Sequence, residues 1–158
     1  MEKNVDVIVV GGGHAGIEAS SAIARFGGSV LLITLKKNQI GEMSCNPAIG
    51  GLGKGHLVRE IDALDGVMGR AIDQSGIQFR MLNRSKGPAV HGPRSQADRS
   101  LYKKSVQEIL LNQQKIRVIE GFVDDLIIDN QEIKGVVLNN DKKFFCSSLV
   151  ITTGTFLG

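Results

Sequence analysis

The thiol of Cys45 is the side chain in this sequence best suited to nucleophilic chemistry. It stands in a loop-like stretch with a proline and glycines, Ser44-Cys45-Asn46-Pro47-Ala48-Ile49-Gly50-Gly51. The thiolate is the reactive form, and Lys54 or the start of a following helix could favour it. The alternative is a partly buried, inert cysteine, which is the commoner case. Cys146 lies in a β-like run with Phe145, so we expect it to pack within a strand.

A block of positive charge lies between Arg80 and Lys104, where seven cationic side chains are accompanied by one carboxylate, Asp98. This segment carries a net charge of +6 while the whole chain carries +3, so the remaining residues are net acidic. Such a block suits the phosphates of a nucleic acid or of a cofactor. Its members are Arg80, Arg84, Lys86, Arg94, Arg99, Lys103 and Lys104.

The better candidates within this block are Arg84, Lys86 and Arg94, because they lie in loop-like sequence close to glycines. Lys103 and Lys104 fit a solvated helix face equally well. Aromatic residues are scarce nearby, so the sequence gives little support to a platform on which bases could stack.

Closely spaced glycines near the start of the chain form the run Gly11-Gly12-Gly13-His14-Ala15-Gly16. A β-branched run over 5–10 precedes them, and a helix-like segment over 17–25 and an apolar run over 30–33 follow. Strand, glycine turn, helix and strand form the unit that holds the pyrophosphate of a dinucleotide. Gly11 permits the turn, Gly13 lets a phosphate approach, and Gly16 lets the helix pack on the sheet. The alternative is a glycine-rich turn without a ligand.

The second strand of such a unit usually ends in Asp or Glu, which accepts hydrogen bonds from ribose hydroxyls. Here the strand ends in Ile33-Thr34-Leu35-Lys36. The Thr34 hydroxyl can still bind a ribose, although without a charge, and Lys36 suits either a phosphate or solvent. The motif therefore does not choose between NAD and FAD.

The remaining pattern predicts an α/β protein with a parallel core and an antiparallel β excursion. We expect one helix over about 57–72, with Leu57, Ile61, Leu64 and Met68 on one face, and another that begins at Ser95 or Gln96. Stretches 36–55 and 83–93 are expected to be loops. Strands are expected over 77–82, 116–120, 122–128, 133–138 and 144–147, with a return strand at Leu149.

Length and composition indicate one soluble domain of 158 residues, 42% apolar and 22% charged. The sequence contains no apolar run that could span a bilayer, no targeting peptide and too few cysteines for a disulfide framework, so we expect a cytoplasmic protein without a membrane partner. The three histidines lack ligand spacing, so no metal site is expected. Residues 148–158 read as a strand entering a glycine turn, which suggests an N-terminal fragment.

Eight segments together resemble the glucose-inhibited division protein A family, in order and over essentially the whole chain. They begin with the glycine run and the Cys45 loop and end with Thr153-Gly154-Thr155-Phe156-Leu157. The others are Gly53-Lys54-Gly55-His56-Leu57-Val58, Ile72-Asp73-Gln74, Gly76-Ile77-Gln78-Phe79-Arg80, Ser85-Lys86-Gly87-Pro88-Ala89-Val90 and Gln96-Ala97-Asp98-Arg99. Members of this family are flavoenzymes that add a carboxymethylaminomethyl group to the wobble uridine of certain tRNAs.

The resemblance implies a Rossmann-like FAD-binding domain of the glutathione-reductase type, of which residues 1–158 would be the truncated N-terminal part. NAD-binding and C-terminal helical regions would lie beyond it. The resemblance also implies NADH and methylenetetrahydrofolate as co-substrates, glycine or ammonium as the nitrogen source, a partner tRNA-modification GTPase and a homodimer. We expect no turnover by residues 1–158 alone.

Carried over by position, Gly11, Gly12, Gly13, His14, Ala15 and Gly16 resemble the turn that binds the FAD pyrophosphate. Val123 resembles the strand position whose main chain holds adenine. Cys45 matches the family cysteine near the flavin, as a nucleophile toward the uridine ring or as part of the pocket wall. The tentative nucleic-acid residues are Arg84, Lys86, Arg94 and Arg99. His91 stands where relatives often carry Arg, so its charge depends on pH.

Two other functions stay open at this point. One is a folate- and FAD-dependent tRNA uridine C5-methyltransferase, which shares the flavin fold and the substrate class. The segments around Cys45 and Lys86 favour the first family. The other is a non-catalytic nucleotide- or RNA-binding module, which would not bind a flavin.

Overall fold

A computed structural model describes residues 4–154 of the chain. Within the described residues the chain forms two compact units, one from residues 4–40 and 110–154 and the other from residues 41–109. The second unit is thus inserted into the sequence of the first. Each unit has its own sheet.

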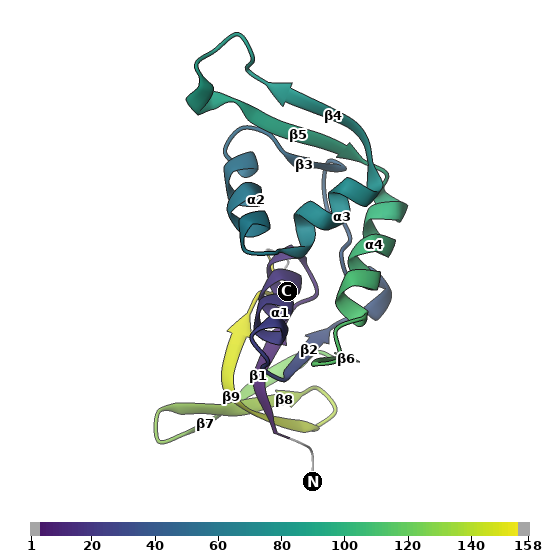
Figure 1. The fold of residues 1–158 in the computed structure, drawn as a ribbon. Helices are drawn as coiled ribbons and strands as arrows, with labels where there is room; N and C mark the ends of the chain where they lie inside the picture. Colours follow the sequence, from purple (N-terminus) through teal and green to yellow (C-terminus); the bar gives the residue numbers. More distant parts are fainter. Residues whose placement is uncertain (1–3, 155–158) are drawn as a thin grey trace. The chain divides into compact units, whose positions relative to one another are not determined.

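The first unit is built on a six-stranded sheet with the order β6-β2-β1-β9-β8-β7 (Figure 1). Strands β6, β2, β1 and β9 are parallel, and β8 and β7 extend the sheet in antiparallel pairing. Its elements are β1 (Val5–Val10), α1 (His14–Arg25), β2 (Val30–Thr34), η1 (Lys37–Gln39), β6 (Ile116–Glu120), β7 (Val123–Asp129), β8 (Glu132–Leu138) and β9 (Lys143–Ile151). The expected parallel core with an antiparallel excursion is confirmed.

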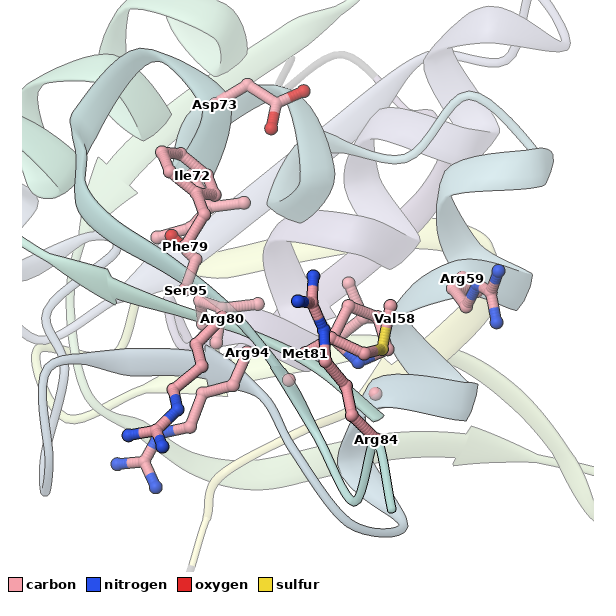
Figure 2. Close-up of a pocket in the computed structure, with 14 residues that line it drawn as sticks. Val58, Arg59, Ile72, Asp73, Phe79, Arg80, Met81, Arg84, Arg94 and Ser95 are labelled. Atoms are coloured by element: carbon pink, nitrogen blue, oxygen red, sulfur yellow. The ribbon is translucent and has the colours of Figure 1, made fainter. Parts of the chain in front are cut away.

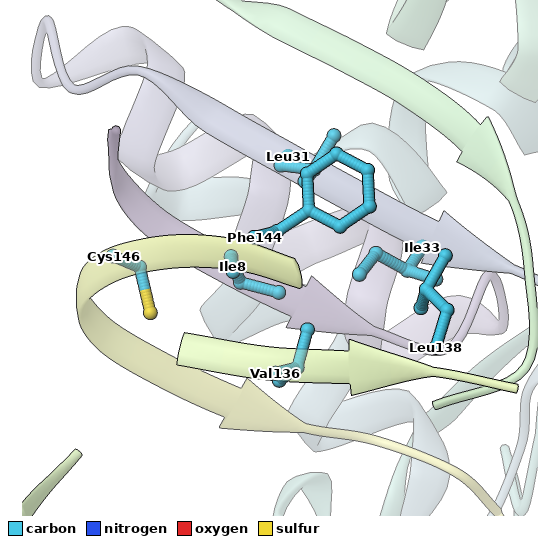
Figure 3. Packing of buried hydrophobic residues seen from close by; sticks show 7 residues of the cluster. All are labelled: Ile8, Leu31, Ile33, Val136, Leu138, Phe144 and Cys146. Atoms are coloured by element: carbon cyan, nitrogen blue, oxygen red, sulfur yellow. The ribbon is translucent and has the colours of Figure 1, made fainter. Parts of the chain in front are cut away.

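The core of this unit joins the parallel and antiparallel parts of the sheet, as Figure 3 shows. Ile8 of β1 and Leu31 of β2 are fully buried and lie in one cluster with Val136 of β8 and Phe144 of β9. All five residues of β2 are buried, as its continuous apolar run predicts for a strand inside a parallel sheet. This core fixes the strand ends on which the first site is built.

Strand β9 is one continuous element where the sequence suggested two. Phe145 pairs with β8 in antiparallel register, while Cys146 and the residues up to Ile151 pair with β1 in parallel register. The expected segment over 144–147 and the return strand at Leu149 are therefore the two halves of one strand. The change of partner, and not a break in the chain, produces the change in the sequence pattern.

The second unit contains a three-stranded antiparallel sheet with the order β3-β5-β4. Its elements are β3 (Ala48–Gly50), α2 (Lys54–Ala63), α3 (Val67–Ser75), β4 (Gly76–Leu82), η2 (Pro88–Val90), β5 (Gly92–Ala97) and α4 (Arg99–Leu111), which belongs to this unit up to Ile109. Tyr102 and Val106 of α4 lie four residues apart, on one face of the helix, and both are buried.

The prediction of one helix over 57–72 was wrong, because α2 and α3 are separate. Asp65 has a positive φ of 61°, a conformation that ends a helix, and Gly66 follows it. The break changes the orientation of the residues around it. Leu57 and Leu64, which were expected on one face of a single helix, are 60% and 75% exposed.

The expected helix start at Ser95 or Gln96 was also wrong, since both residues belong to β5. This strand is held by pairing with β3 on one side and β4 on the other. Helix α4 begins at Arg99, where the Asp98 carboxylate accepts a hydrogen bond of 2.8 Å from the N–H of Leu101. This side-chain cap satisfies an N–H group of the first turn, which has no partner within the helix.

Smaller corrections concern helix α1 and the two expected loops. Helix α1 starts at His14, three residues before the expected Ile17. The stretch 36–55 contains η1, β3 and the start of α2, and the stretch 83–93 contains η2 and the start of β5. No helix in the part of the chain described by the structure is long and apolar enough to cross a membrane.

Candidate functional site

A cavity of about 620 Å³ lies in the first unit at the carboxyl ends of its parallel strands. Its walls are residues 11–13 after β1, residues 34–35 at the end of β2, residues 121–126 around the start of β7, and residues 151–154 at the end of β9. Ligands of open α/β sheets bind at this edge. The cavity is therefore the candidate cofactor site.

The glycine turn brings β1 and α1 into close contact. Gly11 has a φ of +111°, and its N–H donates a hydrogen bond of 2.8 Å to the carbonyl oxygen of Ile33. A Cβ atom on Gly16 would collide with the Gly11 carbonyl oxygen and lie 2.7 Å from the Thr152 hydroxyl. Gly11 and Gly16 thus have the turn and packing roles that their spacing predicts.

Gly13 differs from these two glycines, because a Cβ atom there would meet no protein atom within 4 Å. Its φ of −77° and ψ of −179° are ordinary extended values. The protein itself does not require a glycine at this position. A ligand that approaches the start of α1 closely would require one.

The cavity wall includes no Lys or Arg within the described residues. A phosphate bound there would therefore be neutralised by backbone N–H groups at the start of α1 and by the helix dipole. Helix α1 has 12 residues and carries no acidic residue in its first turn that would oppose an anion.

The structure places the expected cofactor residues in two groups. Those in the cavity wall are Gly11, Gly12, Gly13, Thr34 and Val123. The others, His14, Ala15 and Gly16, form the first turn of α1.

Two carboxylates in the cavity wall were missed by sequence reasoning. At the end of β2, where such folds usually carry an acid, this chain has Thr34, which is 9% exposed and lies against Gly12. Asp124 and Asp125 of β7 border the cavity instead. They directly follow Val123, which the family resemblance assigned to adenine, and that assignment was the nearest signal in the sequence.

Thr152 is a further missed residue, at the end of β9. Its hydroxyl donates a hydrogen bond of 2.8 Å to the carbonyl oxygen of Val10, and its backbone N–H donates to the same oxygen. These bonds tie the end of β9 to the point where β1 enters the glycine turn. The family motif that begins at Thr153 was the nearest signal in the sequence.

The second unit has a cavity of its own, of about 360 Å³, lined by its sheet and by helices α2 and α3 (Figure 2). Its wall is mainly apolar and includes Ile72 and Val58. The Ser95 hydroxyl is buried at 6% exposure and has no hydrogen-bond partner among the described residues. Arg59, Arg80, Arg84 and Arg94 supply positive charge to the wall, and Asp73 supplies a negative charge.

Of the four tentative nucleic-acid residues, Arg84 and Arg94 border this second cavity, while Lys86 and Arg99 do not. Lys86 lies in the exposed segment before η2. Arg99 contacts the cysteine loop: its Nη1 donates to the Met43 carbonyl oxygen at 3.1 Å and its Nη2 donates to the Cys45 carbonyl oxygen. Its guanidinium thus fixes the backbone on both sides of residue 44.

The two thiols differ as the sequence predicts. Cys45 is exposed in the segment before β3, and Cys146 is buried in β9. Burial raises the pKa of the Cys146 thiol, which keeps it protonated and unreactive. Cys45 is therefore the candidate nucleophile of this chain.

Comparison with known proteins gives a family match over residues 6–158, to the model of glucose inhibited division protein A. The chain is 63% identical over 155 residues to the tRNA uridine 5-carboxymethylaminomethyl modification enzyme MnmG of Granulibacter bethesdensis, covering 96% of this chain and 25% of that protein. It therefore spans about a quarter of the length of this curated relative.

Comparison with solved structures points to the same family. The chain matches Aquifex aeolicus GidA with a TM-score of 0.94 and 50% identity, over 97% of this chain and 25% of that one. It matches a probable FAD-dependent monooxygenase from Pseudomonas aeruginosa with a TM-score of 0.66 and 15% identity, over 93% of this chain and 42% of that one. The second match shows a shared fold alone.

Proposed function

The chain belongs to the glucose inhibited division protein A family, and on that premise we propose that it is part of an FAD-dependent enzyme that adds a carboxymethylaminomethyl group at C5 of the wobble uridine of tRNA. The observation that carries this proposal is the identity of 63% to an enzyme named for this modification. The cavity at the glycine turn supplies independent support, since it suits a dinucleotide.

The residues present fit FAD at this cavity. Open space over Gly13 and the N–H groups at the start of α1 suit its two phosphates. We assign ribose contact to the Thr34 hydroxyl and adenine contact to the main chain of Val123, both of which border the cavity. FAD, when bound, supplies reversible hydride and electron transfer. The task of the chain is to bind and orient the flavin and to exclude water.

Cys45 has a proposed role toward the uridine ring. Its sulfur would form a bond to C6, and the electron pair of the C5–C6 double bond would move toward C5, which becomes the nucleophilic carbon. After C5 has formed its bond to the one-carbon unit, loss of the C5 proton to water and departure of the thiolate from C6 restore the double bond. The exposure of Cys45 and the two hydrogen bonds from Arg99 to its loop support this role.

The remaining features belong to the whole protein. We propose that residues 1–158 are the N-terminal part of the FAD-binding domain and that NAD-binding and C-terminal helical regions lie outside them. The coverage of 25% of the curated relative supports this division. NADH and methylenetetrahydrofolate as co-substrates, a partner GTPase, a homodimer and a cytoplasmic location complete the proposal.

Two measurements test the function. Purified full-length protein should show a flavin absorption band, and a colourless protein that stays so with added FAD would indicate a non-catalytic module. Mass analysis of tRNA nucleosides from a deletion strain should show loss of the wobble group. Loss of a simple methyl group would instead indicate the uridine methyltransferase.

A further inference from the structure

Two arginines lie directly opposite each other in the sheet of the second unit. Arg80 of the edge strand β4 is the register partner of Arg94 of the central strand β5. Both side chains are exposed, and Figure 2 shows them running side by side. Like charges at opposite positions of an antiparallel pair destabilise it. The arrangement therefore requires a reason other than stability.

The structure gives neither arginine a carboxylate partner within residues 4–154. The ion pairs of the second unit join Arg70 to Asp65 and Lys104 to Glu108. The Arg80–Arg94 pair is thus two adjacent guanidinium groups with no counter-charge supplied by the described part of the chain. An oxyanion placed between them would remove the repulsion and could accept hydrogen bonds from both.

The same face of the sheet carries a second matched pair. Gln78 of β4 lies opposite Gln96 of β5, two residues from the arginines along each strand, so all four side chains share one face. On the far side of β5, Ala48 and Gly50 of β3 are the register partners of residues 96 and 94. We call Gln78, Arg80, Arg94, Gln96, Ala48 and Gly50 the arginine–glutamine face.

Phe79 and Ser95, which alternate with these residues, point to the opposite side of the sheet. Arg80, Arg94 and Gly50 also border the cavity of the second unit, so the arginine–glutamine face adjoins that cavity. The face has a cationic pair and an amide pair. Amide side chains both donate and accept hydrogen bonds, as nucleotide edges do.

We propose that the arginine–glutamine face binds a single-stranded segment of RNA, with one backbone phosphate between Arg80 and Arg94 and the adjacent nucleotide against Gln78 and Gln96. Charge complementarity supports this occupant, because the segment from Arg80 to Lys104 carries +6 in a chain of +3. Unpaired nucleotides expose the edges that amides can bind. The inference rests on the proposed tRNA substrate and assigns the contact surface.

The test uses full-length protein and a labelled RNA hairpin with a single-stranded loop. Its affinity is measured over a series of salt concentrations for Arg80→Gln, Arg94→Gln and the double variant. Each single change should weaken binding about tenfold and reduce the slope of log affinity against log salt by about 0.7, the value for one phosphate contact on a single strand. The loss of RNA affinity in the double variant should be smaller than the product of the two single losses, because both side chains contact one phosphate.

Arg70→Gln is the matched control, since Arg70 lies in the same unit and is paired with Asp65. It should leave affinity and salt slope unchanged. Thermal unfolding of the free protein separates binding from structure. Because the arginines repel each other, Arg80→Gln should leave the unfolding midpoint unchanged or raise it.

Two results would overturn the proposal. Unchanged affinity and slope in the double variant would mean that RNA does not contact this face. A midpoint lowered by Arg80→Gln would mean that another part of the full-length chain, or a second copy, covers the pair. If either result is found while the wild-type protein still binds flavin and modifies tRNA, the proposed RNA contact at this face is wrong and the proposed function is unaffected.

Discussion

Substitution by alanine should lower the stability of the apo protein at Gly16 and should lower only the FAD affinity at Gly13. At Gly16, the new Cβ atom would collide with the backbone oxygen of Gly11. A backbone atom cannot rotate away, so we expect a cost at the upper end of the range for overpacking, about 3 kcal/mol. The full-length Gly16→Ala protein should therefore unfold more easily even without FAD.

At Gly13, the new Cβ atom would meet open space, and the φ of −77° suits alanine. The loss of a good helix N-cap and the reduced entropy of the unfolded chain each change stability by about 1 kcal/mol or less, with opposite signs. The apo protein should unfold as the wild type does. If the methyl group displaces a phosphate from one backbone N–H, the lost hydrogen bond is worth about 1.5–3 kcal/mol, or about 10- to 150-fold in FAD affinity.

The assay pairs thermal unfolding of apo protein with titration of FAD, followed by flavin fluorescence. Each variant is the control of the other, because one tests packing and the other tests ligand approach. Wild-type FAD affinity in Gly13→Ala would refute the reasoning, since it would place the pyrophosphate away from this residue. An apo unfolding midpoint for Gly16→Ala equal to that of the wild type would contradict the packing argument.

Three further outcomes are expected. Lysine cannot direct two fixed N–H groups at the Cys45 loop, so Arg99→Lys should increase the alkylation rate of Cys45 several times and should lower tRNA modification. An unchanged alkylation rate would contradict the positioning role of Arg99. In the wild type, peptide mapping after brief alkylation should find Cys45 modified and Cys146 intact, because burial raises the pKa of the Cys146 thiol. The Asp6 pKa is lowered by the Ser29 backbone N–H and then by its hydroxyl, so the resulting stability is present at neutral pH and is lost as pH falls through the lowered pKa. Ser29→Ala should reduce the loss of stability between neutral pH and about pH 3 in urea unfolding, and an identical loss would contradict this.

The first unit was largely predictable because local patterns agree with its fold. The β-branched run over 5–10, the glycine turn and the apolar run over 30–33 each specify one element, and together they specify a known supersecondary unit. Asp124 and Asp125 were predictable as cavity residues only through the resemblance, which placed the neighbouring Val123 at the cofactor. Their position depends on the order of the strands, which no local pattern encodes.

The second unit was predicted less well, because its sheet depends on pairing between distant segments. Strand β5, Gly92–Ala97, has no apolar alternation, and its strand character comes from β3 and β4 on either side. The opposition of Arg80 and Arg94 likewise follows from register alone. Sequence reasoning found the positive charge of this segment but could not tell that two of its members face each other.

The pairing of β1 with β9 has a consequence for synthesis of the protein. Thr152, which bonds to Val10, follows it by 142 residues. At about 5–20 residues per second, a ribosome needs on the order of 7–30 s to make the intervening chain. During that interval the apolar strand at the start of the chain has one open hydrogen-bonding edge, which is where a chaperone or a second nascent chain would bind.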